Sequence, residues 1–133
     1  RAIIQGALNK AGENARVGTI GWCFGGGWSL KASIMAGERG EACVMYYGMP
    51  VTEQEAVAPL EAPVLAIFAR QDEWITPKVA ADFEEMMAEA DKTVQVQSYD
   101  ADHAFANPSS PRYDQQAARA ANAAAEAFLE ANL

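Results

Sequence analysis

Short apolar runs alternate with helix-like segments along this sequence, and that alternation constrains the fold more than any other feature. Each run is short enough to be a buried strand. The runs are Val17–Gly21, Ala42–Tyr47 and Val64–Ala69, and a fourth segment, Val94–Tyr99, is predicted as a strand from the strict alternation of its residues. Strands that alternate with helices form a mostly parallel sheet through right-handed crossovers. We therefore predict an α/β fold, a mostly parallel sheet of about four strands flanked by helices, in a single domain over residues 1–133.

The segments between the runs carry helix signals. Thr76 and Pro77 are typical of an N-cap and the first residue of a helix. The glycine run Gly25–Gly27 is interpreted as a turn, and residues 51–59 as a loop with one helical turn. The segments predicted as helices are 1–11, Trp28–Ala36, Pro77–Ala90 and Pro111–Leu133.

Charge and composition exclude several classes of function. The formal net charge of −8 argues against nucleic acid or an anionic membrane as the main partner. No apolar stretch has the length of a membrane span. A metal site is not expected, because one histidine and two cysteines that are far apart in the sequence supply too few ligands. No cofactor is expected either. So few cysteines favour a reducing, cytoplasmic setting over a disulfide-bonded secreted one.

A candidate nucleophile follows the first strand. In a parallel sheet, ligands bind outside the carboxyl ends of the strands, and the segment Gly21-Trp22-Cys23-Phe24-Gly25 lies there. Its spacing is that of a nucleophile elbow with cysteine in place of serine. We expect side chains at the flanking glycines to collide with the turn, the helix N-terminus to favour a Cys23 thiolate, and the Phe24 N–H to hold an oxyanion. The alternatives are a glycine-rich turn with an inert cysteine, or a phosphate loop, which lacks its Gly-Lys-Ser/Thr here. Cys43, within the second strand, is expected in the core.

A base and an acid follow two other strands. His103, the single histidine, comes after the last strand, and it is the one candidate in this chain for a general base. Asp72, just past the third strand, is expected to orient the imidazole. Asp100 and Asp102 are rivals for that role, and a purely structural histidine is the other interpretation. Glu73 is expected to be a solvated neighbour.

The chain resembles the dienelactone hydrolase (carboxymethylenebutenolidase) family of the α/β-hydrolase superfamily. The resemblance is carried by Gly18–Gly27, Tyr46–Gly48, the Asp72 segment and Asp102–Pro108. With Ser110–Asp114 and the alanine-rich tail, it extends over nearly the whole chain. It implies a Cys23–His103–Asp72 triad that hydrolyses a cyclic or activated ester through a thioester, without a cofactor. Family members are longer, so the chain is expected to correspond to their carboxyl-terminal part, a truncated α/β-hydrolase fold without the early strands and the second oxyanion donor. Asn107 stands where some members have an arginine for the substrate carboxylate.

Four aromatic residues lie beside these motifs and are candidates to line an apolar pocket for a small ester or lactone, although each also fits a place in the core. They are Trp22, Tyr46, Trp74 and Phe105. An open edge along Val17–Gly21 predicts self-association, most simply a homodimer that covers this edge. The alternatives to a working hydrolase are a truncated, catalytically weak oligomeric module and a redox-sensing thiol.

Overall fold

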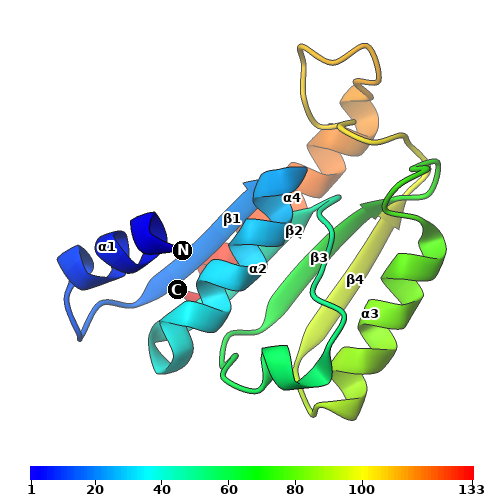
Figure 1. The fold of residues 1–133 in the computed structure, drawn as a ribbon. Helices are drawn as coiled ribbons and strands as arrows, with labels where there is room; N and C mark the ends of the chain where they lie inside the picture. The colour runs from blue at the N-terminus through cyan, green and yellow to red at the C-terminus, as the bar shows by residue number, and fades with distance from the viewer.

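The computed structural model describes residues 1–133 and contains one parallel sheet with helices on both faces (Figure 1). The strands are β1 (Val17–Trp22), β2 (Gly40–Tyr46), β3 (Val64–Ala69) and β4 (Val94–Tyr99), and they lie side by side in this order. The helices are α1 (Ala2–Ala11), α2 (Phe24–Ala36), α3 (Pro77–Glu89) and α4 (Gln115–Asn132), with short 3-10 turns at Gly37–Arg39 and Gln54–Val57. The α/β prediction and its four parallel strands are confirmed.

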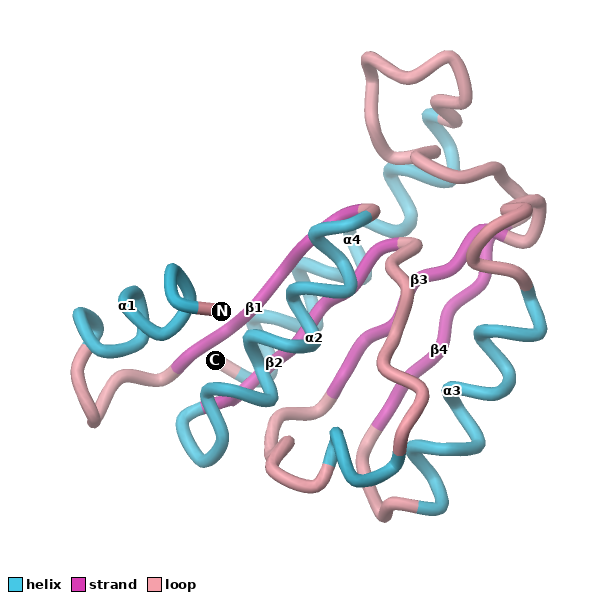
Figure 2. The backbone as a smooth tube through the Cα atoms, viewed as in Figure 1, coloured by secondary structure: helices cyan, strands magenta, loops and turns pink.

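The sheet divides the core into two layers. Alternate residues of a strand point to opposite faces, so Cys43 and Met45 pack with Leu30 of α2 and Phe83 of α3 on one face. On the other face, the next residues along β2 and β3 pack against Ala121 of α4. Figures 1 and 2 show this arrangement, with α2 and α3 in front of the sheet and α4 behind it. None of the helices combines the length and the apolar character that a membrane crossing requires.

Two helices begin at positions that differ from the prediction. Helix α2 already begins at Phe24, so the glycines predicted as a turn form its first turn instead. A Cβ on Gly26 would lie 2.7 Å from the carbonyl oxygen of Tyr46, so close packing of the helix onto the end of β2 explains the glycine there. Helix α4 begins at Gln115 rather than Pro111, because the side chain of Asp114 caps it by accepting a hydrogen bond from the Ala117 N–H at 3.0 Å.

The register of the strands brings particular loops together. Trp22 of β1 is level with Tyr46 of β2, so the residues that follow them, Cys23 and Tyr47, leave the sheet side by side. Ala69 of β3 is level with Tyr99 of β4 in the same way. The loops after β3 and β4 therefore run next to each other, and the Gln71 N–H donates to the carbonyl of Ala101 at 3.0 Å.

Strand β1 is an edge of the sheet, as predicted. It pairs with β2 on one side and with no strand on the other. Ile20 and Trp22 point to the face that α4 covers only in part, and their side chains are 42% and 45% exposed. An edge strand with large apolar side chains in water is a template for pairing with another chain.

Candidate active site

Cys23 lies on a sharp, strained turn between β1 and α2. Its backbone has φ 55° and ψ −125°, a left-handed conformation that a residue with a side chain adopts only at a cost of about 1–3 kcal/mol. The turn is held by two backbone hydrogen bonds, from the Cys23 N–H to the Tyr46 carbonyl at 3.0 Å and from the Gly26 N–H to the Cys23 carbonyl at 2.9 Å. Strain that the surrounding structure maintains at one exposed turn is typical of a functional residue.

The two glycines of the elbow differ in what they permit. A Cβ on Gly21 would collide with the backbone carbonyl of Gly25, whereas a Cβ on Gly25 would meet no atom within 4 Å. The predicted collision is therefore correct for Gly21 and wrong for Gly25. Phe24 is the first residue of α2, so its N–H has no partner within the helix and is available to an anion beside Cys23.

His103 and Asp72 form a close pair. Nδ1 of His103 lies 2.6 Å from Oδ2 of Asp72. The other oxygen, Oδ1, accepts hydrogen bonds from the backbone N–H groups of Trp74 and Ile75, both at 2.9 Å. The Asp72 side chain has no exposed surface, while that of His103 is 19% exposed. The carboxylate is thus fixed from one side and presents its second oxygen to the imidazole.

The rival carboxylates have other partners. Asp100 accepts a hydrogen bond from the side-chain amide of Gln71 at 3.3 Å. Asp102 accepts one from the backbone N–H of His103 at 2.6 Å and forms an ion pair with Arg112 at 3.5 Å. Neither reaches the imidazole ring, so the structure brings Asp72 to His103 and places its two rivals elsewhere.

Tyr47 is a site residue that sequence reasoning missed. Its ring lies against the imidazole of His103, with centroids 5.2 Å apart, and its backbone has a positive φ of 34°. Burial raises the pKa of Tyr47, and the charge of a Cys23 thiolate raises it further. Its position directly after β2, at the carboxyl end of a strand, was the available signal.

The family model for the dienelactone hydrolase family matches residues 2–133. The chain belongs to the dienelactone hydrolase family. It is 29% identical over 112 residues to carboxymethylenebutenolidase 1 of Cupriavidus pinatubonensis, covering 84% of this chain and 47% of that protein. It is 30% identical over 124 residues to the carboxymethylenebutenolidase of a Pseudomonas species, covering 92% of this chain and 51% of that one.

A solved structure shows the same fold. A dienelactone hydrolase-like promiscuous phosphotriesterase from metagenomic libraries superposes with a TM-score of 0.79 at 23% identity, over 96% of this chain and 59% of that chain. The chain thus has the α/β-hydrolase fold of the dienelactone hydrolases in truncated form, and it spans about half the length of the curated relatives it matches.

The dienelactone hydrolase elbow does not favour a resting thiolate here. Burial raises the pKa of the Cys23 thiol, and the negative charge of Asp72 raises it further. This direction is opposite to the one that we expected from the helix N-terminus alone, because burial and a nearby carboxylate both disfavour the charged sulfur. No hydrogen bond joins Cys23 to His103 in this structure, and Nδ1 of the histidine is engaged by Asp72.

The four aromatic candidates divide into two pairs. Tyr46 and Phe105 are buried, and the Tyr46 hydroxyl donates to Asn122 of α4 at 2.8 Å, so both belong to the core. Trp74 is 62% exposed and meets His103 edge-on, with centroids 5.7 Å apart. Trp22 is exposed and stacks on Tyr46. The two tryptophans are the ones that a bound molecule can reach. Cys43 is buried, as predicted.

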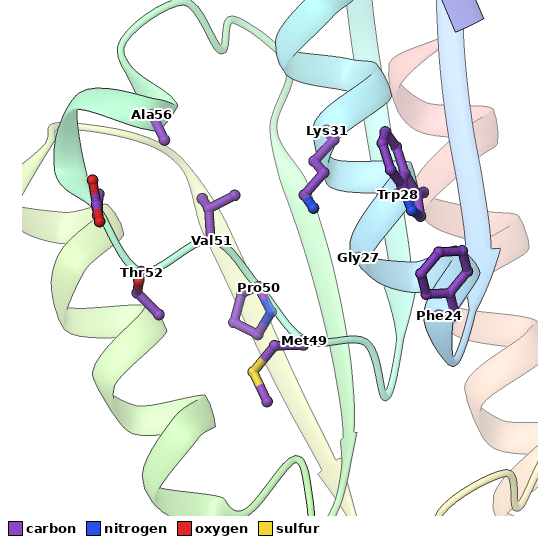
Figure 3. Close-up of a pocket in the computed structure, with 10 residues that line it drawn as sticks. Phe24, Gly27, Trp28, Lys31, Met49, Pro50, Val51, Thr52 and Ala56 are labelled. Atoms are coloured by element: carbon purple, nitrogen blue, oxygen red, sulfur yellow. The ribbon is translucent and has the colours of Figure 1, made fainter. Parts of the chain in front are cut away.

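A groove of about 550 Å³ lies next to the elbow, on the face that α2 covers (Figure 3). Phe24, Trp28 and Lys31 of α2 form one wall, and the segment Met49–Glu53 after β2 forms the other. Cys23, Asp72 and His103 do not line it. The chain also has no group of three His, Cys, Asp or Glu side chains placed to hold a metal ion.

Proposed function

We propose that this chain carries the reacting groups of a cysteine hydrolase of carboxylic esters or lactones, with Cys23 as nucleophile, His103 as base and Asp72 as the acid that orients the base. The observation that supports it most strongly is the 2.6 Å contact between Asp72 and Nδ1 of His103, on the rim where Cys23 occupies a strained elbow. Because Asp72 engages Nδ1, Nε2 is the ring nitrogen left for the thiol proton.

The steps follow from these roles. His103 takes the proton of Cys23 through Nε2, and the sulfur bonds to the carbonyl carbon of the ester. The oxyanion that forms accepts a hydrogen bond from the Phe24 N–H. When the tetrahedral intermediate collapses, the carbon–oxygen bond to the alcohol breaks and His103 returns its proton to the leaving oxygen. Water, deprotonated by His103, then attacks the thioester, which releases the acid and restores the thiol.

A resting neutral thiol fits this order of events. Its raised pKa means that little thiolate exists before a substrate arrives, so alkylating agents meet a slow nucleophile. The proton moves to His103 once the ester carbonyl offers the sulfur an electrophile. The substrate class, a small ester or lactone, is proposed from the names of the relatives and from the open tryptophans Trp22 and Trp74.

Hydrolysis of 4-nitrophenyl acetate by the chain and by its Cys23→Ser and Cys23→Ala variants tests the proposal. We expect a burst of 4-nitrophenol equal to one per chain, followed by slower turnover, and neither with alanine. Turnover that persists in Cys23→Ala would contradict Cys23 as the nucleophile.

The second candidate is a catalytically weak hydrolase-fold module. Two observations favour it: the chain spans about half of its relatives, and Cys23 makes no hydrogen bond to His103. Loss of one oxyanion donor lowers the rate by a factor on the order of 10²–10³. This candidate would be supported if iodoacetamide modifies Cys23 while the chain hydrolyses the ester no faster than the Cys23→Ala variant does.

We also propose that two copies of the chain associate through the edge of β1, in a two-fold dimer that covers Ile20 and Trp22. Sedimentation velocity at micromolar concentration tests the dimer, and a single species with the mass of one chain would contradict it.

We also propose a reducing, cytoplasmic setting for the chain, because both of its cysteines are free.

A further inference from the structure

We propose that Arg112 is a positioning residue for the imidazole of His103, an inference that rests on the proposed role of His103 as the base. Arg112 comes from the loop before α4, nine positions along the chain from the histidine, and nothing in the nucleophile–acid–base pattern includes it.

The geometry that carries the inference is a closed ring of contacts around the imidazole. Nδ1 of His103 meets Asp72, and the other oxygen of Asp72 accepts the backbone N–H of Trp74. The guanidinium of Arg112 lies over the Trp74 ring, 6.0 Å from its centroid. Nε of Arg112 pairs with Oδ2 of Asp102 at 3.5 Å. Oδ1 of Asp102 accepts the backbone N–H of His103 at 2.6 Å, which closes the ring.

Arg112 provides a second link between the two halves of this ring, in addition to the direct contact of Asp72 with His103. Asp72 and Trp74 belong to the loop after β3, and Asp102 and His103 to the loop after β4. Arg112 contacts one residue of each loop, Trp74 by stacking and Asp102 by charge. It therefore ties the backbone of the histidine to the indole that packs against the edge of its ring.

The indole needs such support because most of it is in water. Trp74 is 62% exposed, and its ring meets the imidazole at an interplanar angle of 76°, an edge-on contact. The ring of Tyr47, which also lies against the imidazole, is buried and fixed by the core. With Arg112 in place, His103 contacts one ring that the core fixes and one that Arg112 supports, so Nε2 keeps one direction.

The ion pair is too exposed to stabilise the fold as a whole. The side chains of Arg112 and Asp102 are 44% and 40% exposed, and surface pairs of this kind contribute little to global stability. A change at Arg112 is therefore expected to alter the position of His103 while leaving the melting temperature nearly as it was. This separates a positioning role from a structural one.

The test compares Arg112→Ala and Arg112→Lys with Arg119→Ala, a matched control on the exposed side of α4. His103 is the single histidine of the chain, so its ring protons give one assignable set of NMR signals. In Arg112→Ala we expect these signals to move toward their free-histidine positions as the ring current of Trp74 is lost. We expect kcat for 4-nitrophenyl acetate to fall by about tenfold with KM unchanged, since a small misplacement of a catalytic group has effects of this size or larger.

Lysine keeps the charge beside Asp102 but not the planar stacking on Trp74, so Arg112→Lys is expected to recover part of both the shift and kcat. Unmoved histidine signals in Arg112→Ala, or a rise in KM at constant kcat, would overturn the proposal, the latter because it would mean that Arg112 contacts the substrate. If Arg112→Ala does not fold, Asp102→Asn cuts the same link from the other end. An inactive parent protein would refute the proposed function, yet the histidine signals would still test this inference.

Discussion

The carboxylate of Asp72 is shared between His103 and the backbone of its own loop. Oδ2 lies 2.6 Å from Nδ1 of the histidine, and Oδ1 accepts the N–H groups of Trp74 and Ile75 at 2.9 Å each. Both of these N–H groups need an acceptor. If an amide replaces the carboxylate of Asp72, its oxygen must therefore point toward Trp74 and Ile75.

This arrangement makes Asp72→Asn an informative substitution. The amide oxygen must take the place of Oδ1, because Trp74 and Ile75 both donate there, so the NH2 group faces Nδ1 of His103. The imidazole is then forced to carry its proton on Nε2 and cannot accept the proton of Cys23. We expect kcat for 4-nitrophenyl acetate to fall by a factor on the order of 10²–10⁴, as for the wrong tautomer in a serine triad.

Asp100→Asn is the matched control, since Asp100 contacts the exposed Gln71 instead of the imidazole. It should keep the parental kcat. An Asp72→Asn variant with more than half of the parental kcat would show that the imidazole does not depend on this carboxylate.

A second prediction concerns how the rate of Cys23 alkylation changes with pH. Burial raises the pKa of Cys23, and the charge of Asp72 raises it further, so the thiol stays protonated at neutral pH. The rate of alkylation by iodoacetamide should rise with pH, with a midpoint above that of an ordinary thiol. Asp72→Asn removes the second cause and should lower the midpoint.

The same variant is therefore expected to speed alkylation at neutral pH while it slows ester hydrolysis. Cys23→Ala gives the background, because the remaining cysteine, Cys43, is buried. A midpoint that stays in place in Asp72→Asn would show that the carboxylate charge does not act on the sulfur.

The elbow glycines allow a matched pair of substitutions. Gly21→Ala places a Cβ against the carbonyl of Gly25, whereas Gly25→Ala meets no atom. We expect Gly21→Ala to lower the free energy of unfolding by at least about 1–3 kcal/mol, the usual cost of overpacking. Gly25→Ala lies within α2 and should be neutral or slightly stabilising, by up to about 1 kcal/mol. Urea denaturation measures both, and equal midpoints for the two variants would contradict the close packing at Gly21.

The edge of β1 gives a prediction about assembly. Ile20 is 42% exposed on this edge strand, and a lysine there places a charge in any interface that covers it. We expect Ile20→Lys to shift the sedimentation coefficient from that of a dimer to that of a monomer at micromolar concentration. Lys31→Glu, on α2 and away from the edge, is the control for a change of surface charge. A dimer that persists in Ile20→Lys would place its interface elsewhere.

The strands could be predicted well from the sequence because three are short apolar runs and the fourth, Val94–Tyr99, has the alternation of a strand. The bounds of β3 and β4 agree with the prediction at both ends. The start of α2 could not be predicted, because glycines that oppose helix formation are there for contact with the end of β2. Local preference was overridden by packing between segments that are distant in the sequence.

Some features of the site could likewise be predicted from the sequence, and others could not. Cys23, Asp72 and His103 follow strands, and a rule about strand ends is enough to find them. Burial of the sulfur cannot be read from the elbow motif, and it reversed the expected direction of the thiol pKa. Arg112 lies in a loop without any periodic pattern, so its contact with Trp74 emerges only in three dimensions.

The order of the strands has a consequence for the reaction distance. Cys23 follows β1 and His103 follows β4, the two outermost strands of the sheet. The separation of sulfur and imidazole therefore depends on β2 and β3, the strands that lie between them. In the proposed reaction, a change that bends the sheet between these two strands is expected to alter how readily the proton passes from the sulfur to the imidazole.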